Sequence, residues 1–112
     1  MATRADHGKA FVCGVMIKRR RGPLALGGWS WPFGRLAIGE SCVVAWGIGL
    51  RRFAVRVPFS ELQTVRGRPR RRTGTLRFER QGAGDLVVTA FRDQYEGIVD
   101  SLETRRVTAT TD

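Results

Sequence analysis

The sequence is poor in the residues that catalysis and metal binding most often require. It has one histidine, His7, and two cysteines, Cys13 and Cys42, so a four-ligand zinc site cannot be assembled from Cys and His. It contains no Gly-x-Ser-x-Gly motif, no phosphate-binding glycine loop and no paired acid motif. We therefore expect a protein that is not an enzyme and that holds no cofactor and no metal.

Long apolar segments are also absent. The longest apolar run, Ala10 to Ile17, has eight residues, whereas a membrane-spanning helix needs roughly 20. Basic residues follow this run at 18–21, whereas in a secretory signal the charge comes first. These features predict a cytoplasmic protein, with peripheral attachment to a membrane as the alternative. Both cysteines lie among apolar residues and are expected to be buried and free.

Acidic residues are scarce relative to basic ones. Ten Asp and Glu face 20 Lys and Arg, for a net charge of +10, and 18 of the basic residues are arginine. Such a balance favours an anionic partner: an acidic lipid surface, an acidic protein or nucleic acid. Arginine is the better bidentate ligand for phosphate, but a GC-rich genome gives the same excess, so both explanations stay open. The oligomeric state is not indicated.

Alternating apolar and polar residues predict about seven short strands in one domain. Pro58 closes one strand, because proline cannot donate to a sheet ladder, and Gly34-Arg35 indicates a bulge. The expected strands lie at 10–17, 29–38, 42–46, 50–57, 62–66, 75–80 and 86–90. Residues 1–8 are expected to be a mobile lead-in, residues 9–106 the domain and residues 107–112 a disordered tail.

The pattern changes after residue 90 from the period of a strand to that of a helix. An apolar stripe at i, i+3, i+4 and i+7 predicts an amphipathic helix, formed by Tyr95, Ile98, Val99 and Leu102. Asp93 and Glu96 resemble a capping pair at its start, and Arg105 and Arg106 suit the dipole of its last turn. The predicted fold class is mainly β with one C-terminal α-helix: a small open antiparallel barrel or curved roll that the helix caps at one end.

The alternation also predicts which side chains form the core. Strand positions that face the same way as the helix stripe should be buried together. These are Trp31, Phe33, Leu36, Phe53, Val55, Leu76, Phe78, Val88, Ile98 and Leu102.

The chain resembles the pleckstrin-homology superfold, in particular small bacterial PH-like and GRAM-like domains. The likeness lies in the segments 32–38 (PFGRLAI), 53–62 (FAVRVPFSEL) and the closing helix 94–102, and it covers about residues 29–106. It implies a small barrel of about seven strands that an amphipathic helix plugs. Such barrels bind phosphoinositides or peptides, so the fold alone does not name a function.

The resemblance also implies an anion site. Lipid-binding members carry a basic patch near the loop that joins the first two strands, where this chain has Lys18, Arg19, Arg20 and Arg21. Arg35 is the only basic residue of the strand that follows, which departs from the usual pattern. We expect this cluster, supported by Arg51, Arg52 and Arg56, to contact an anionic membrane surface or an acidic protein.

A second basic segment gives the alternative, a DNA- or RNA-binding protein. Arg66-Gly67-Arg68-Pro69 matches the core of an AT-hook, in which a slim glycine lets two arginines enter a narrow A·T minor groove, and Arg70, Arg71 and Arg72 follow it. The competing interpretation is a solvated turn between two strands. Three tryptophans at strand spacing fit either a core or a stacking platform for single-stranded nucleic acid: Trp29, Trp31 and Trp46.

Overall fold

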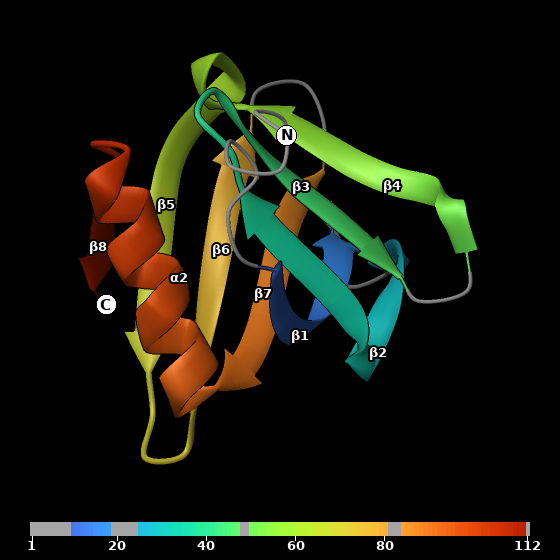
Figure 1. The fold of residues 1–112 in the computed structure, drawn as a ribbon, viewed down its shortest axis with the longest axis horizontal. Helices are drawn as coiled ribbons and strands as arrows, with labels where there is room; N and C mark the ends of the chain where they lie inside the picture. Colours follow the sequence, from blue (N-terminus) through green and yellow to red (C-terminus); the bar gives the residue numbers. More distant parts are fainter. Residues whose placement is uncertain (1–9, 19–24, 48–49, 81–83, 112) are drawn as a thin grey trace.

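The described part of the chain folds into one mostly antiparallel sheet that a single α-helix covers on one face (Figure 1). The computed structural model describes residues 10–18, 25–47, 50–80 and 84–111. Its strands are β1 (Ala10–Lys18), β2 (Ala25–Ile38), β3 (Cys42–Gly47), β4 (Leu50–Pro58), β5 (Leu62–Pro69), β6 (Thr73–Arg80), β7 (Asp85–Phe91) and β8 (Ala109–Thr111). A 3-10 turn, η1 (Phe59–Glu61), joins β4 to β5, and helix α2 (Arg92–Thr104) follows β7. The predicted fold class, mainly β with one C-terminal helix, is confirmed.

The strand order across the sheet is β4-β3-β2-β1-β7-β6-β5-β8. Neighbouring strands run antiparallel, except that β8 lies parallel to β5. Within the described residues β4 and β8 form the two edges and do not pair with each other, so the sheet is curved but open. This agrees with the expected open barrel or curved roll that the helix caps.

The core lies between the concave face of the sheet and α2. Alternate strand residues point inward, and the helix stripe of Tyr95, Ile98 and Leu102 packs on them. Six residues of the predicted core are buried: Leu36, Leu76, Phe78, Val88, Ile98 and Leu102. Val55 is partly buried against them, and the side chain of Phe53 lies outside the described residues.

Two residues of the predicted core are exposed instead. Trp31 is 48% and Phe33 56% exposed. The bulge that we expected at Gly34-Arg35 is wrong, because Gly34 to Ile38 pair without interruption. The irregularity in β2 lies earlier, where Gly34 pairs with Cys13 but Trp29 pairs with Val15. Residues 30–33 therefore face the single residue Gly14 and leave the ladder. Because no bulge shifts the face between Phe33 and Leu36, alternation from the buried Leu36 places Phe33 on the outer face, and Trp31 lies in the irregular segment beside it.

The ends of the helix also differ from expectation. Phe91 is the N-cap and makes no side-chain cap, and Asp93 lies in the first turn, so the predicted capping pair is wrong. The helix ends at Thr104, which places Arg105 at the C-cap and Arg106 beyond it. No helix in the described part of the chain has the length and apolar character to cross a membrane.

The end of the chain forms a strand where we expected a disordered tail. Ala109, Thr110 and Thr111 pair with Val65, Arg66 and Gly67 of β5. This short strand covers an edge of β5 that would otherwise present unpaired backbone groups. Strand β5 is therefore an interior strand with a fixed position. Asp112 lies outside the described residues.

Candidate anion-binding surface

Strand β5 and the residue that follows it present a row of arginines on the outer face of the sheet, the face opposite α2. Arg66, Arg68 and Arg70 are exposed, whereas Val65 before them and Gly67 between the first two are buried. Strand geometry explains this alternation and spaces alternate residues by about 6.6 Å. We call Arg66, Arg68 and Arg70 the arginine row.

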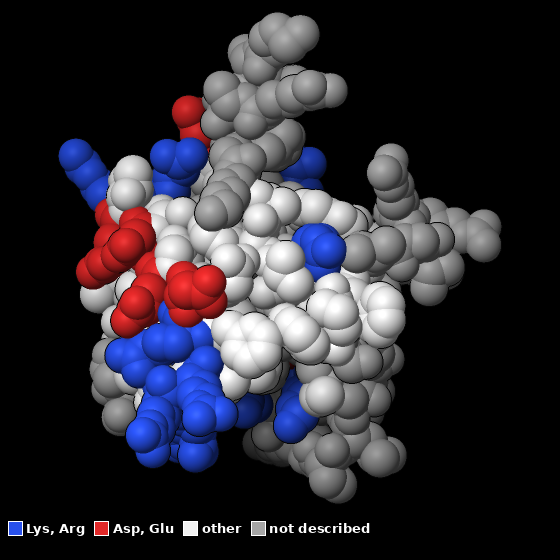
Figure 2. Space-filling model, turned by 60° about the horizontal axis from the view of Figure 1, so that its bottom comes forward, with Lys and Arg blue, Asp and Glu red and all other residues white. Residues whose placement is uncertain are grey.

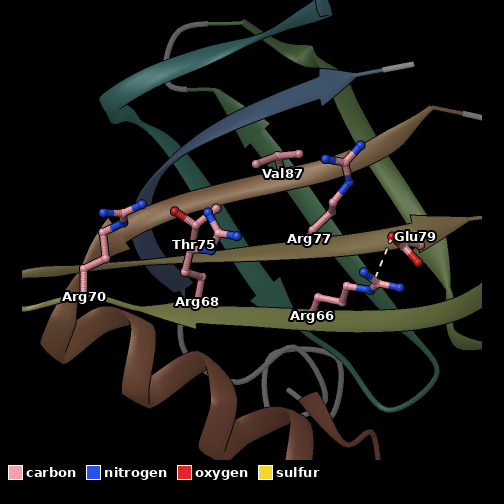
Figure 3. A pocket seen from close by; sticks show the side chains of 7 residues that line it. All are labelled: Arg66, Arg68, Arg70, Thr75, Arg77, Glu79 and Val87. Carbon is pink, nitrogen blue, oxygen red and sulfur yellow. Dashed lines mark ion pairs between the residues drawn. The ribbon is translucent and has the colours of Figure 1, made fainter. Parts of the chain in front are cut away.

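A hollow of about 370 Å³ lies over this row (Figure 3). Strands β6 and β7 complete it, because their outward positions pair with the row across the sheet. Arg66 stands opposite Arg77, and Arg77 opposite Val87. The lining residues are Arg66, Arg68, Arg70, Thr75, Arg77, Glu79 and Val87. Four guanidinium groups thus border one hollow that contains a single carboxylate.

Two acidic residues hold the arginines at one end of the hollow. Arg77 Nε lies 2.9 Å from Asp85 Oδ2, and Asp85 is fully buried. Arg66 Nε lies 3.6 Å from Glu79 Oε2, the pair that Figure 3 marks with a dashed line. These pairs offset the repulsion between Arg66 and Arg77, which face each other directly across two strands. They also restrict the side chains, so less conformational entropy is lost when an anion binds.

The β5–β6 turn, residues 70–72, extends the cationic surface and is fastened to α2. The backbone N–H of Arg92 donates to Arg72 O at 2.8 Å, and its guanidinium donates to Arg70 O. Glu96 pairs with Arg92 at 3.0 Å and orients it. The exposed Arg70, Arg71 and Arg72 are therefore carried on a turn with a defined position.

Charge is separated over the molecule. Figure 2 shows Lys and Arg gathered at one end, with acidic side chains grouped beside them. The exposed acids of α2 recur at helical spacing, at Asp93, Glu96, Asp100 and Glu103. The helix therefore presents an acidic face, whereas the opposite side of the sheet presents the arginine row. An anionic ligand is attracted to the sheet side and repelled from the helix.

Comparison with models of protein families and with curated proteins finds no match to this chain. The chemistry of the surface is therefore argued from its own residues. No group of three or more His, Cys, Asp and Glu side chains able to hold a metal ion occurs among the described residues. The chemistry available at this surface is the binding of anions by arginine.

The first predicted anion site lies largely outside the described residues. Lys18 ends β1, is partly buried and pairs with Asp85 of β7, whereas Arg19, Arg20 and Arg21 are among the residues not described. Arg51 and Arg52 belong to β4, but their side chains are not described. Arg56 is exposed on the same edge strand, at the far side of the sheet from β5.

The AT-hook segment is part of β5 and not of the turn. Gly67 is buried, and a Cβ added there would overlap the hydroxyl of Tyr95. An AT-hook needs its glycine to face the minor groove, whereas this glycine faces the core. Arg66 and Arg68 face outward on the opposite side of the strand. Insertion into a minor groove would therefore require β5 to leave the sheet.

Sequence reasoning missed the contribution of β6 to the site. The outward alternation of Thr75, Arg77 and Glu79 is visible in the sequence, but it does not show that Arg77 lies opposite Arg66. The close spacing of the two strands around a basic turn was the available signal. Of the three tryptophans that the sequence suggested as a stacking platform, Trp31 has a phenylalanine as its aromatic neighbour. The ring contact of Trp31 is with Phe91, at 4.9 Å between centroids.

Proposed function

We propose that the chain is a non-enzymatic module that binds a phosphate-bearing anion on the arginine row. The observation that carries this proposal is the hollow of about 370 Å³ bordered by four arginines from two paired strands. A guanidinium offers a fixed fork of N–H donors that matches phosphate oxygens, so adjacent arginines can hold adjacent phosphates. A PH-like roll is the proposed fold family. The helix that directly follows the seventh strand supports it.

A salt titration tests the proposal. A fluorescently labelled inorganic polyphosphate, which has neither bases nor lipid, is the probe, and its affinity is measured by anisotropy over a range of NaCl concentrations. We expect Arg68→Ala and Arg70→Ala each to weaken binding and to lower the salt slope by about one, because each removes roughly one phosphate contact. Arg56→Ala, which loses the same charge from edge strand β4, should leave both nearly unchanged. Equal effects of all three variants would show non-specific attraction and refute the proposal.

Vesicle sedimentation distinguishes the role of the arginine row from that of the other basic cluster, residues 18–21. The 18–21 cluster remains the predicted contact for an anionic membrane surface or an acidic protein. Sedimentation with vesicles rich in anionic lipid compares a variant with Ala at Arg19, Arg20 and Arg21 with one carrying Ala at Arg66, Arg68 and Arg70. If only the first variant loses vesicle binding and only the second loses polyphosphate binding, the two clusters serve different ligands. Polyphosphate binding that depends on residues 19–21 alone would contradict our assignment.

A further inference from the structure

Two aromatic side chains lie exposed next to the arginine surface. Trp31 is 48% and Phe91 47% exposed, and their rings meet edge to face at 4.9 Å with an interplanar angle of 80°. Large apolar rings are usually covered in a small protein, because their burial is strongly favourable. A pair that remains half exposed marks a surface for a partner.

The aromatic pair and the arginine row share one face of the sheet. On β7, Leu86, Val88 and Ala90 point into the core, so Val87 and Phe91 point outward. Val87 lines the arginine hollow, and Phe91 lies four residues further along the same strand, about 13 Å away. Phe91 pairs with Thr73 on the neighbouring strand β6, and the carbonyl of Thr73 accepts a hydrogen bond from the N–H of Arg70 at 2.7 Å. Phe91 therefore lies about two strand spacings, roughly 10 Å, from Arg70 at the end of the arginine row. Trp31 reaches Phe91 from β2, on the side away from the row.

The bulge that carries Trp31 is held in a defined conformation. Arg35 Nη1 donates to Pro32 O at 2.6 Å and to Gly34 O at 2.9 Å, so one guanidinium fixes the bulge from both sides. Phe91 is fixed in turn as the last residue of β7 and the N-cap of α2. Because both rings are pre-positioned, little ordering is needed when a flat ligand stacks on them.

We propose that this face binds an extended single strand of nucleic acid, with phosphates on the arginine row and bases stacked on Trp31 and Phe91. The inference rests on the proposed phosphate binding and adds the identity of the ligand. Arginines at every second residue of a strand repeat at about 6.6 Å, an interval comparable to that of phosphates in a stretched polynucleotide. The threonines between row and rings, Thr73, Thr75 and Thr89, offer hydroxyls to the sugars and base edges.

Two other anionic macromolecules fit the same residues less well. A duplex keeps its bases stacked inside, so exposed rings gain no stacking from it, whereas unpaired bases stack on aromatic side chains. A bilayer presents a broad surface, which does not fill a hollow whose arginines line its interior. A single strand can enter the hollow with its phosphates while its bases reach the rings.

The test compares ligands that differ only in their bases. Anisotropy is measured with a labelled oligothymidylate of about 12 nucleotides, within the range of single-strand site sizes. The comparison ligands are a duplex of the same length, an oligomer of abasic sugar-phosphate and anionic vesicles. We expect Trp31→Ala and Phe91→Ala each to weaken oligothymidylate binding about tenfold and to leave abasic binding unchanged. Trp31→Phe, which keeps a ring, should retain most of the affinity, and Arg68→Ala should weaken both ligands.

The outcomes separate this inference from the function on which it rests. If Arg68→Ala weakens both ligands but the aromatic variants leave oligothymidylate binding unchanged, phosphate binding stands and base stacking is refuted. Tighter binding of the duplex than of the single strand also overturns the inference. So does vesicle binding that depends on Trp31 without any preference of the protein for oligothymidylate over the abasic oligomer. If neither oligomer binds and Arg68→Ala is silent with polyphosphate, the proposed function fails as well.

Discussion

At the scale of single residues, the ring of Tyr95 leaves no room for a side chain at two glycines of the β5–β6 hairpin. Its ring lies across the inner face of β5 and β6, so an added Cβ at Gly67 would overlap its hydroxyl and one at Gly74 would overlap ring carbons. Burial raises the pKa of this hydroxyl above 10.0. The role of these two glycines is therefore to leave space for the ring of Tyr95 in the core. Any test of DNA binding that uses Gly67→Ala also changes the core.

Gly67→Ala should destabilise the protein by about 1–3 kcal/mol, as overpacking in a core does. In a Tyr95→Phe background the same change should cost much less, because the overlapping hydroxyl is gone and the next ring atom, Cζ, lies 3.5 Å away. Gly74→Ala is the matched control, since its overlap is with ring carbons that phenylalanine keeps. Urea unfolding of the three single and two double variants measures the coupling. Equal rescue at both glycines would show that the hydroxyl is not the obstacle.

The thiol of Cys13 should make the free energy of unfolding depend on pH in the alkaline range. Burial raises the pKa of its thiol from 9.0 to about 12, although the charge of Arg35 opposes the shift. Between these values the folded chain keeps a proton that the unfolded chain has lost. The free energy of unfolding should therefore fall by about 1.4 kcal/mol for each pH unit above 9 on account of this group, and be unaffected by it below pH 9.

Cys13→Ala should remove that contribution to the slope, at the cost of some stability at every pH. Val15→Ala, which trims another buried side chain of the same strand, should lower stability but keep the slope of the wild type. Denaturant unfolding at several pH values between 8 and 11 makes the comparison, over the range where the shift acts. A Cys13→Ala slope equal to that of Val15→Ala would contradict the assignment.

At the scale of elements, α2 ends in a conformation that its residue does not favour. Arg106 has φ 62°, and its N–H donates to Glu103 O at 2.9 Å while Val107 N–H donates to Leu102 O at 2.8 Å. This is the Schellman arrangement, in which the left-handed position is usually glycine. A side chain there costs about 1 kcal/mol because its Cβ crowds the carbonyl.

Arg106→Gly should therefore stabilise the protein by about 0.5–1 kcal/mol, measured as a higher urea midpoint at an unchanged m-value. Arg105→Gly is the control, since that residue has φ −90° and donates to Gly39 O through its side chain. It should lower stability. A loss of stability in both variants would mean that the Arg106 side chain contributes more than its backbone strain costs.

Elements with a plain period were predictable from the sequence. The helix stripe and the alternation in β6 and β7 identify the buried face, because Leu76, Phe78 and Val88 follow the pleat without interruption. Trp31 and Phe33 were assigned to the wrong environment because we expected a bulge at Gly34-Arg35 to put them on the same face as Leu36. The position of the bulge depends on pairing with β1, which no local period encodes. Strand β8 was missed for a similar reason. Three small residues become a strand only because β5 offers an edge.

At the scale of the whole molecule, the position of the site was less predictable than its chemistry. The excess of arginine already indicated an anionic partner, but the sequence divided the arginines into segments. The hollow joins Arg66 to Arg77 through the register of two strands, and its lining does not include Lys18, the one residue of the 18–21 cluster that the structure describes. The strand order and register determine which arginines share a surface, and neither can be read from the sequence alone.

The same topology separates charge, and its effect on ligand encounter can be measured. Asp93 lies in the first turn of α2, beside the arginine turn to which Arg92 is bonded. Glu61 lies at the other end of β5, about 25 Å away along eight residues of strand. The Debye length at 0.1 M salt is about 10 Å, so only the nearer carboxylate weakens the field at the turn.

Asp93→Asn should therefore raise the association rate of labelled polyphosphate by about two- to fivefold at low ionic strength, since a multivalent ligand senses the lost negative charge several times. Glu61→Gln changes the net charge by the same amount and should leave the rate nearly unchanged at 0.1 M salt. Stopped-flow association measured between low and high salt tests both variants, and the difference should vanish at 1 M, where the Debye length is about 3 Å. Equal acceleration by the two variants would show that the ligand responds to net charge alone, and the arginine surface would then have no special part in capturing it.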